Sequence, residues 1–210
     1  MLVIKGQLLC SMPMSLVIKA LDVKPPDKVI QAAGRLKHRD FITVGLIIKK
    51  KNIIPDNWLY IHNPELKIGR LQNYKNWSKA MVRKPETTTT LGLEYFCNEG
   101  DKLWKMTDKK LINLGISEIA KMGFIKPSEV IDGTVIRMKR AYPIYDLNYK
   151  KNVNIVRDWL ENNFTNLVLI GRNGMHTYNS QDHSTLVGLM AAKNIVNQET
   201  NDLWKADPDA

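Results

Sequence analysis

The stretch Asn166–Val196, NLVLIGRNGMHTYNSQDHSTLVGLMAAKNIV, decides how this sequence is expected to fold. Residues 166–170 place four apolar side chains in a row, which favours a short buried strand. Gly171 ends that strand, and a polar loop with a second glycine, Gly174, follows. The segment therefore predicts a strand that leads through a glycine turn into a loop.

A helix is expected to begin after this loop, at Asp182 or Ser184, because both residue types cap helix N-termini. Its apolar side is expected to consist of Leu186, Leu189, Met190, Ala192 and Ile195. The first turn of a helix leaves backbone N–H groups without partners and carries the positive end of the helix dipole. A strand end, a glycine turn and a helix N-terminus together predict a site for an anion or for the polar edge of a cofactor.

Composition limits the classes of protein to which this chain can belong. The chain has 210 residues, of which 44% are hydrophobic and 25% are charged, as is usual for a soluble globular protein. It contains no run of about 18 apolar residues, so no membrane span is predicted, and its start does not have the pattern of a signal peptide. Cys10 and Cys97 fit no metal or redox spacing, so no metal site is expected. Reduced thiols in a cytoplasmic protein are the default expectation.

The chain is basic, with 31 Lys and Arg against 21 Asp and Glu and a net charge of +10. A basic chain raises the question of nucleic-acid binding. The lysines are dispersed, however, and Lys49–Lys51 is the only compact cluster. No RNA-binding aromatic motif or helix-turn-helix pattern is visible, so no nucleic-acid partner is expected. An anionic small molecule, such as a nucleotide-sugar or a flavin pyrophosphate, fits the charge equally well.

Periodic patterns along the rest of the chain predict an α+β fold. The expected strands are residues 7–11, 40–50, 57–62, 66–72, 87–96 and 130–139, and the expected helices are 14–21, 25–36, 109–122 and 147–162. We expect a mixed or antiparallel sheet of about six strands with flanking helices, and two chain ends that form an α/β layer. The expected division is residues 1–36, 37–146 for the sheet, 147–198, and a frayed tail at 199–210.

Several catalytic and cofactor motifs are absent. No two of the 12 glycines are separated by a single residue, so the G-x-G-x-x-G turn of a complete Rossmann unit is missing. There is no P-loop, no H-E-x-x-H and no G-x-S-x-G. The chain is therefore not expected to hold an adenine dinucleotide by itself. No carboxylate pair or Ser-His set indicates a hydrolase, and the catalytic residues stay unassigned.

A series of short motifs gives a more specific indication. They are Cys10-Ser11-Met12-Pro13-Met14, Asp40–Leu46, Gly69–Tyr74 with Asn76-Trp77-Ser78, Glu94–Cys97, Arg140–Tyr145, Gly171-Arg172 and Gln181-Asp182-His183-Ser184. Their order resembles that in UDP-galactopyranose mutases and related amine-oxidase-like and protoporphyrinogen-oxidase-like FAD-dependent oxidoreductases. The resemblance covers residues 8–196 and only the C-terminal half of the family, without its Gly-rich half. Ser180 departs from the Asn that mutases commonly have at this position.

The resemblance implies FAD as the cofactor and a set of residues around it. The implied cofactor-binding residues are Gly171, Arg172, Gly174, Gln181, Asp182, His183 and Ser184. Arg172 is expected beside the flavin ribityl chain or pyrophosphate, with a surface arginine that caps a loop as the alternative. The helix N-terminus is expected at the flavin pyrimidine edge, where its dipole stabilises an anionic reduced flavin. Asp182 can also cap the helix, and a structural hydrogen bond is the alternative for His183.

A substrate site is implied at Arg70, Tyr142 and Tyr178. The two tyrosines would reach the diphosphate of a nucleotide-sugar, with plain amphipathic packing as the alternative. Arg70 lies on an expected strand beside Tyr74 and Trp77 and suggests an anion and ring-stacking platform, with a plain sheet surface as the alternative. Trp58 and Tyr60 alternate with apolar residues, so one face of their strand is aromatic.

The function implied is that of a substrate-binding and partial FAD-binding portion of an FAD-dependent oxidoreductase-like enzyme. Its small-molecule substrate would be a nucleotide-sugar in the mutase case, and the residues do not choose between a mutase and a hydride-transferring oxidase. A flavin-free interaction domain, or one half of a split flavoprotein, is the alternative. We expect the chain alone not to retain FAD tightly. Apolar residues within 8–12 and 186–195 are expected to bind an N-terminal FAD-binding partner or a second copy.

Overall fold

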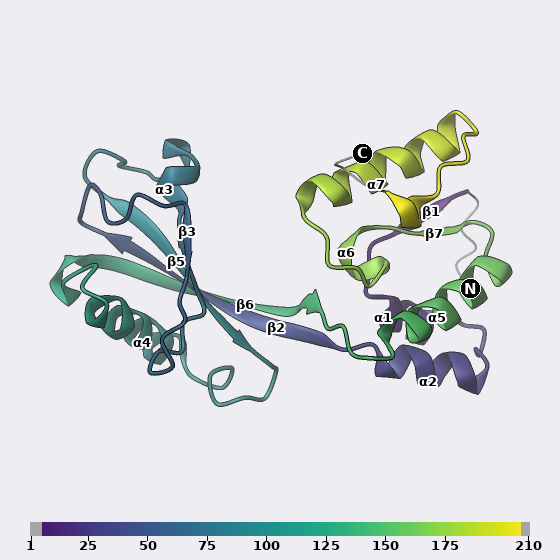
Figure 1. Ribbon diagram of the computed structural model, residues 1–210, viewed down its shortest axis with the longest axis horizontal. Helices are drawn as coiled ribbons and strands as arrows, with labels where there is room; N and C mark the ends of the chain where they lie inside the picture. The colour runs from purple at the N-terminus through teal and green to yellow at the C-terminus, as the bar shows by residue number, and fades with distance from the viewer. Residues whose placement is uncertain (1–5, 207–210) are drawn as a thin grey trace. The chain divides into compact units, whose positions relative to one another are not determined.

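The computed structural model describes residues 6–206, and the chain divides into two compact units. Unit 1 comprises residues 1–38 and 142–210, and unit 2 comprises residues 39–141. The elements of unit 1 and those of unit 2 are labelled in Figure 1, and each unit is described by itself.

Unit 2 is built on an antiparallel sheet with the order β3-β4-β5-β2-β6. Its strands are β2 (His38–Ile48), β3 (Trp58–Tyr60), β4 (Arg70–Asn73), β5 (Thr89–Cys97) and β6 (Val130–Pro143). The sheet thus has five strands where about six were expected. The strand expected at residues 7–11, which the expected division placed outside the sheet region, pairs in unit 1.

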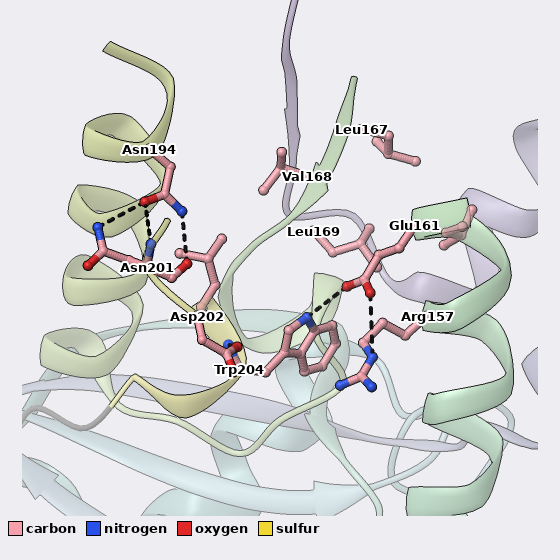
Figure 2. Close-up of a pocket in the computed structure, with 11 residues that line it drawn as sticks. Arg157, Glu161, Leu167, Val168, Leu169, Asn194, Asn201, Asp202 and Trp204 are labelled. Carbon is pink, nitrogen blue, oxygen red and sulfur yellow. Dashed lines mark hydrogen bonds and ion pairs between the residues drawn. The ribbon is translucent and has the colours of Figure 1, made fainter. Parts of the chain in front are cut away.

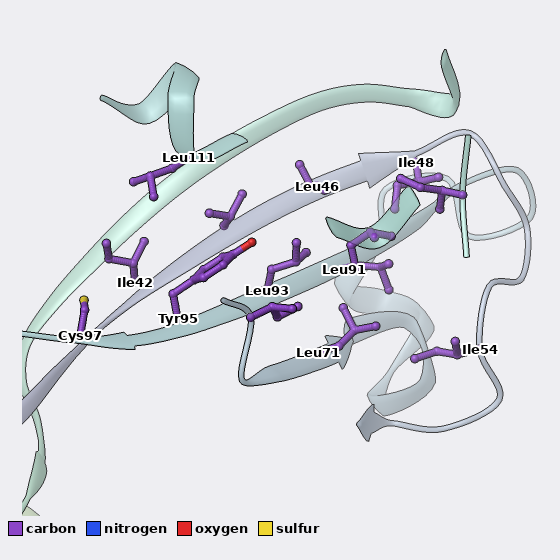
Figure 3. Packing of buried hydrophobic residues seen from close by; sticks show 14 residues of the cluster. Ile42, Leu46, Ile48, Ile54, Leu71, Leu91, Leu93, Tyr95, Cys97 and Leu111 are labelled. Atoms are coloured by element: carbon purple, nitrogen blue, oxygen red, sulfur yellow. The ribbon is translucent and has the colours of Figure 1, made fainter. Parts of the chain in front are cut away.

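One face of this sheet is covered by the helix α4 (Asp108–Lys121). Thr107 begins this helix, and its hydroxyl accepts a hydrogen bond from the backbone N–H of Lys110. Period-2 alternation directs every second residue of β2 and β5 inward, so that the core collects branched aliphatic side chains around Tyr95 (Figure 3). The buried set includes Ile42, Val44, Leu46, Ile48, Leu91, Leu93 and Leu111. The shorter elements of unit 2 are α3 (Tyr74–Trp77), η1 (Lys79–Met81) and η2 (Pro127–Glu129).

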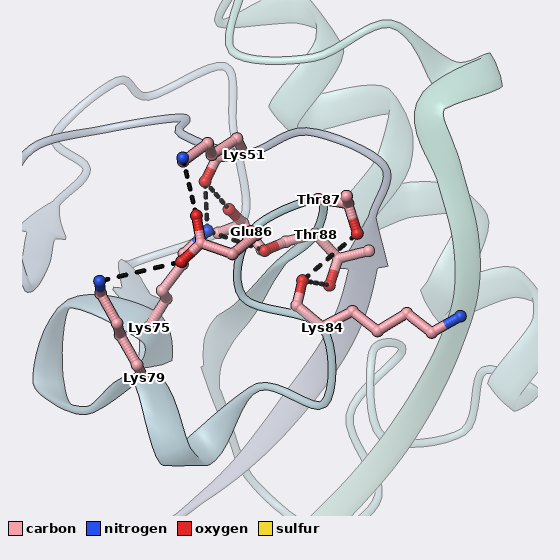
Figure 4. Close-up of polar contacts among 8 residues, drawn as sticks. Lys51, Lys75, Lys79, Lys84, Glu86, Thr87 and Thr88 are labelled. Atoms are coloured by element: carbon pink, nitrogen blue, oxygen red, sulfur yellow. Dashed lines mark hydrogen bonds and ion pairs between the residues drawn. The ribbon is translucent and has the colours of Figure 1, made fainter.

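The lysine-rich turn after β2 is fixed by contacts within unit 2 (Figure 4). The ammonium of Lys51 lies 2.7 Å from a carboxylate oxygen of Glu86, and both side chains are largely exposed. Lys75 is buried, and its ammonium donates to the carbonyl of Thr88 at 3.0 Å and also to the carbonyl of Lys51. Burial lowers the pKa of Lys75. These lysines therefore hold the turn together through hydrogen bonds and ion pairs.

Unit 1 contains a two-stranded parallel sheet of β1 (Leu8–Cys10) and β7 (Leu167–Leu169). The helices of this unit are α1 (Met14–Ala20), α2 (Asp27–Arg35), α5 (Tyr149–Asn163), α6 (Gly171–Gly174), α7 (Gln181–Val196) and the 3-10 turn η3 (Leu203–Lys205). Its core joins α1, α2 and α5 to β7 through Met14, Val17, Val29, Ala33, Val156, Leu160 and Leu169. No described helix is long and apolar enough to cross a membrane.

The apolar residues of α7 are in part buried and in part exposed. Val187 and Ala191 are its buried residues, whereas Leu189 and Ile195 of the expected apolar side are 57% and 39% exposed, within the segment 186–195 that was expected to bind a partner. Apolar residues lie on all sides of this helix, so periodicity could not choose its inner face. The described part of the tail, which was expected to fray, is instead packed: Trp204 contacts the core of unit 1 and donates to Glu161 at 3.1 Å.

Candidate functional site

Two glycines shape the turn that follows β7. Gly171 has a φ of +71°, a conformation that side chains disfavour, and it begins the short helix α6 directly after the strand. The loop expected here thus starts with one helical turn. A Cβ on Gly174 would lie 2.6 Å from the carbonyl oxygen of Cys10. Glycine at 174 therefore allows α6 to approach the end of β1.

Arg172 lies next to the N-terminus of α7. Its guanidinium donates to the carbonyl of Asn179, with 2.9 Å from Nε, and Asn179 directly precedes Ser180, the N-cap of α7. The rings of Tyr142 and Tyr178 stack on each other with centroids 5.6 Å apart. The guanidinium carbon lies 5.1 Å from the centroid of Tyr142 and 5.0 Å from that of Tyr178. The structure thus brings one predicted cofactor-binding residue and both predicted substrate-binding tyrosines together.

An open hollow of about 440 Å³ lies at the start of α7. It is lined by Arg172, Asn179, Ser180, Gln181, Ser184 and Thr185. Three of the predicted cofactor-binding residues, Arg172, Gln181 and Ser184, therefore line one cavity. The hydroxyl of Ser184 donates to the side-chain oxygen of Asn179 at 3.1 Å, which fixes the wall of the hollow.

The side chains of Asp182 and His183 are engaged elsewhere. Asp182 accepts hydrogen bonds from the hydroxyl of Ser180 and from the backbone N–H of His183, and these bonds lower its pKa. The ring nitrogen Nε2 of His183 lies 2.8 Å from the carbonyl oxygen of Ala206 and so contacts the tail. The helix begins at Gln181, one residue before the first expected start, and the side chain of its N-cap, Ser180, caps no backbone N–H group.

Sequence reasoning missed two residues that build this site. Asn179 is buried and receives hydrogen bonds from Arg172 and Ser184. The hydroxyl of Tyr145 accepts from the backbone N–H of Tyr178, and its ring stacks on Tyr149 at 4.0 Å. Burial raises the pKa of Tyr145. An asparagine and a tyrosine beside loop residues carry no spacing signal, so only the fold identifies them.

Arg70, the third predicted substrate-binding residue, belongs to unit 2. Its Nε donates to Oε2 of Glu94 at 2.6 Å, and both side chains are nearly buried. The guanidinium carbon lies 5.9 Å from the ring centroid of Trp58 and 6.0 Å from that of Tyr60. The rings beside the guanidinium of Arg70 thus come from the neighbouring strand β3, whereas the sequence expectation placed Arg70 beside Tyr74 and Trp77.

A second hollow of about 410 Å³ lies in unit 1 between α5, β7 and the tail (Figure 2). Its polar groups bond to one another: Trp204 donates to Glu161, and the guanidinium carbon of Arg157 lies 5.0 Å from the ring centroid of Trp204. Asn194 and Asn201 exchange hydrogen bonds in the same wall. These contacts hold the tail against the unit, and none of the predicted site residues lines this hollow.

The hollow at α7 is the better candidate site for a polar ligand. A 16-residue helix presents its positive end there, and a guanidinium lies beside that end. Both features favour a negatively charged or strongly polar group, such as a phosphate or a ring edge with carbonyl oxygens. The residues that the structure describes include no group of three or more His, Cys, Asp or Glu placed to hold a metal ion.

No protein-family model and no curated protein sequence matches the chain. Its fold is nevertheless similar to that of several solved structures. The reduced form of a UDP-galactopyranose mutase matches 98% of this chain with a TM-score of 0.81 at 20% identity. A protein assigned as a protoporphyrinogen oxidase from Exiguobacterium sp. 255-15 matches 81% with a TM-score of 0.58 at 16% identity. A Pyrococcus furiosus protein matches 96% with a TM-score of 0.52 at 14% identity.

The likeness covers only part of each of these proteins. This chain spans 44% of the mutase, 39% of the Exiguobacterium protein and 43% of the Pyrococcus protein. The chain therefore has the fold of somewhat less than half of such proteins, which agrees with a resemblance to one half of a flavoprotein. At these identities the similarity shows the fold alone.

Proposed function

We propose that this chain is the substrate-binding and partial FAD-binding portion of an FAD-dependent oxidoreductase-like enzyme. The observation that carries the proposal is the position of Arg172, at the end of a parallel strand and beside the N-terminus of α7, on the wall of an open hollow. This arrangement suits an anionic or carbonyl-rich cofactor edge. The similarity of the fold to a UDP-galactopyranose mutase supports it.

In this proposal the flavin lies against the hollow at α7. Because Gly174 has no Cβ, α6 can lie close to the end of β1. This close approach leaves space beside the turn for the flavin ring system. Arg172, Gln181 and Ser184 contact polar atoms of the flavin, and the dipole of α7 stabilises negative charge on it. Asp182 and His183 order the first turn of α7 and the tail. FAD would supply the redox or nucleophilic chemistry, and the chain would hold and tune it.

Tyr142 and Tyr178 are the residues proposed to contact the substrate. The guanidinium of Arg172 lies beside both stacked rings, and Tyr178 is 56% exposed. Phenolic hydroxyls can donate to phosphate oxygens. We propose a small-molecule substrate that reaches these tyrosines, and specifically a nucleotide-sugar if the enzyme is of the mutase type. Arg70 belongs to the substrate-binding unit of the same enzyme.

We also propose a protein partner for the two-stranded sheet of unit 1. The described sheet of unit 1 has only β1 and β7, and two parallel strands seldom form a stable sheet alone. Leu8, Leu9 and Met12 are 39–40% exposed at this sheet, and Leu189 is exposed on α7. We propose that a dinucleotide-binding α/β unit pairs with β1 and covers these residues. Without that unit, the same residues would promote self-association of the chain.

The Arg172→Ala variant tests the flavin site. Titration of the chain with FAD, followed by quenching of flavin fluorescence, should show weak saturable binding, because the adenine end has no Gly-rich turn to hold it. Loss of the guanidinium should weaken this binding about tenfold, which corresponds to ~1.4 kcal/mol. The Arg172→Lys variant should bind FAD about as weakly as Arg172→Ala, because an ammonium cannot reproduce the paired, coplanar N–H donors of a guanidinium.

Arg35→Ala is the matched control, because Arg35 is an exposed arginine on α2 of the same unit. Its FAD binding should equal that of the unmodified chain, and circular dichroism should show that both alanine variants keep their helices. Equal FAD affinity in Arg172→Ala and Arg35→Ala would overturn the assignment, as would the absence of saturable binding. The second outcome would favour a flavin-free interaction domain.

A further inference from the structure

A small hollow lies between the neighbouring helices α2 and α5 of unit 1 (Figure 1). Its volume is about 240 Å³, and it shares no lining residue with the hollow at α7. From α2 it is lined by Lys28, Gln31, Ala32 and Arg35. Residues at this spacing lie on the same face of a helix. One side of the hollow is therefore formed by a single face of α2.

The other side of the hollow is the N-terminal end of α5. It is lined by the N-cap Asn148 and by Lys151, Asn152 and Ile155. The side chain of Asn148 caps no backbone N–H group, and the first turn of this 15-residue helix holds no acidic residue. Asp146 accepts from the backbone N–H of Asn148 at 2.9 Å, but it does not line the hollow. The positive end of the helix dipole thus lies at the hollow and favours an anion there.

Three cationic side chains line the hollow without a counter-charge. Lys28 and Arg35 lie on α2 and Lys151 lies on α5, and all three are exposed. Within residues 6–206 none of them takes part in an ion pair, and the described lining includes no carboxylate. Like charges that gather around one space repel one another. An anion in the hollow would replace this repulsion with attraction to all three cations.

A buried amide forms the floor of the hollow. Asn152 is 3% exposed and, with Ala32, is one of the two buried residues of the lining. Its Nδ2 is buried and has no hydrogen-bond partner among the described residues. Leaving a buried N–H donor unpaired is unfavourable, and such groups are paired in most native proteins. The unpartnered amide therefore indicates, independently of the charges, that a hydrogen-bond acceptor from outside the chain binds here.

The lining also restricts the kind of ligand. Lysine and arginine side chains donate hydrogen bonds and accept none, so a ligand rich in acceptor oxygens suits them. A volume of about 240 Å³ is below the ~300–1,000 Å³ that is typical of sites for drug-sized ligands. The described lining includes no aromatic side chain, so a nucleobase would have no ring on which to stack. A compact oxyanion is the ligand class that fits these limits.

We propose that the hollow between α2 and α5 binds the terminal phosphate of a small phosphomonoester. Lys28, Arg35 and Lys151 surround the phosphate oxygens, and the amide of Asn152 donates to one of them from the floor. A terminal phosphate carries about two negative charges and three acceptor oxygens, so it can satisfy all of these groups together. The phosphates of FAD lie within a pyrophosphate bridge and include no terminal group, so this site is distinct from the proposed flavin site.

Nuclear magnetic resonance on the full, isotope-labelled chain tests the proposal. The probes are glycerol 3-phosphate and inorganic phosphate, with dimethyl phosphate and glycerol for comparison, all at one ionic strength. The side-chain amide signals of Asn152, which Asn152→Leu identifies by their loss, should shift saturably with both probes. Dimethyl phosphate has a single negative charge and no terminal phosphate, so it should bind clearly more weakly. Glycerol should cause no shift.

Arg35→Ala and Lys151→Ala should each weaken the binding of glycerol 3-phosphate about threefold to tenfold, because each removes one exposed cation from a charge-assisted contact. Asn152→Leu should weaken it too, as measured from the backbone N–H signals of the first turn of α5. This variant should keep the free energy of unfolding, because the amide has no partner to lose. A loss of stability without a loss of phosphate binding would show that Asn152 is purely structural and would contradict the proposal.

Lys150→Ala is the matched control, because Lys150 is an exposed lysine beside Lys151 that does not line the hollow. Its phosphate affinity should equal that of the unmodified chain. Three further outcomes would overturn the proposal. They are the absence of a saturable shift at Asn152, equal losses of affinity in Lys150→Ala and Lys151→Ala, and binding of dimethyl phosphate as tight as that of glycerol 3-phosphate.

Two arginine variants separate this site from the flavin site. Arg172→Ala should leave the phosphate-induced shifts of Asn152 unchanged, because Arg172 lines the other hollow. Arg35→Ala should weaken phosphate binding and leave FAD binding unchanged. The inference goes beyond the proposed function and does not depend on it, so either proposal can fail while the other holds.

Discussion

His176 is a buried histidine in the loop between α6 and α7, and its backbone has a φ of +50°. Its ring packs edge-on against His38, with centroids 4.8 Å apart. Burial lowers the pKa of His176, and the carbonyl of Ile144 and the carboxylate of Asp146 oppose that shift only in part. The loop that carries Tyr178 and Asn179 therefore depends on a histidine that is held neutral.

Acid should destabilise unit 1 through this residue. In the unfolded chain His176 takes up a proton near its ordinary pKa of about 6.5, whereas the folded protein resists that proton. The stability is fully present above the unfolded pKa and falls as the pH drops below it, by at most ~1.4 kcal/mol per pH unit. Urea unfolding at a series of pH values below neutrality measures this slope.

In the His176→Asn variant the free energy of unfolding should fall less steeply as the pH drops below neutrality, because asparagine does not titrate. Asparagine also tolerates the positive φ at this position. His62→Asn is the control, since His62 is exposed, and its slope should match that of the unmodified chain. A slope that His176→Asn leaves unchanged would show that another group causes the acid sensitivity.

At this scale the sequence identified part of the candidate site. Arg172, Gln181 and Ser184 line one hollow as expected, because a strand end, a glycine turn and a helix start must converge. Asn179 was missed because its role depends on where its carbonyl points, and backbone direction in a loop has no residue pattern. Asp182 and His183 were close in sequence to the hollow, but their side chains turn toward Ser180 and Ala206.

Among the elements, α4 is fixed to the sheet of unit 2 by a buried carboxylate. Glu118 accepts from the backbone N–H groups of Lys67 at 2.7 Å and Ile68 at 3.2 Å, and from the hydroxyl of Tyr95 at 3.0 Å. Burial, together with the nearby Glu118, raises the pKa of Tyr95. The side chain thus joins the helix, the segment before β4 and the centre of β5.

Glu118→Ala should destabilise unit 2 by about 3 kcal/mol, because three donors, two of them buried, lose their acceptor. Glu118→Gln keeps one acceptor oxygen and should cost less, about 1 kcal/mol. Glu65→Ala is the control, since Glu65 forms an exposed ion pair with Lys121 and should change stability by less than ~1 kcal/mol. Urea unfolding followed by circular dichroism gives the three values, and equal losses for Glu118→Ala and Glu65→Ala would contradict this account.

Most elements follow from sequence patterns, and the misses have physical causes. The strand expected at residues 40–50 and the helix expected at 109–122 match β2 and α4 within a few residues. The inner face of α7 could not be predicted, because that helix is apolar on all sides. The five strands expected within residues 37–146 all form in the sheet of unit 2, so the expected count of about six was one too high.

For the whole molecule, we propose that the chain is one portion of a flavoenzyme. Unit 1 supplies β1, β7 and the N-terminus of α7, and the fold matches 44% of a UDP-galactopyranose mutase structure. The sequence has no Gly-rich dinucleotide turn. A flavin held only at the α7 hollow should bind weakly, and a dinucleotide-binding unit against β1 should make that binding tight.

The most direct test is to produce the chain together with a candidate dinucleotide-binding α/β polypeptide, and to measure the flavin absorbance of the purified complex. Our account predicts a yellow complex with stoichiometric FAD, a colourless product for the chain alone, and an Arg172→Ala complex that assembles with less flavin. A colourless complex, or a chain that carries stoichiometric FAD without any partner, would contradict it.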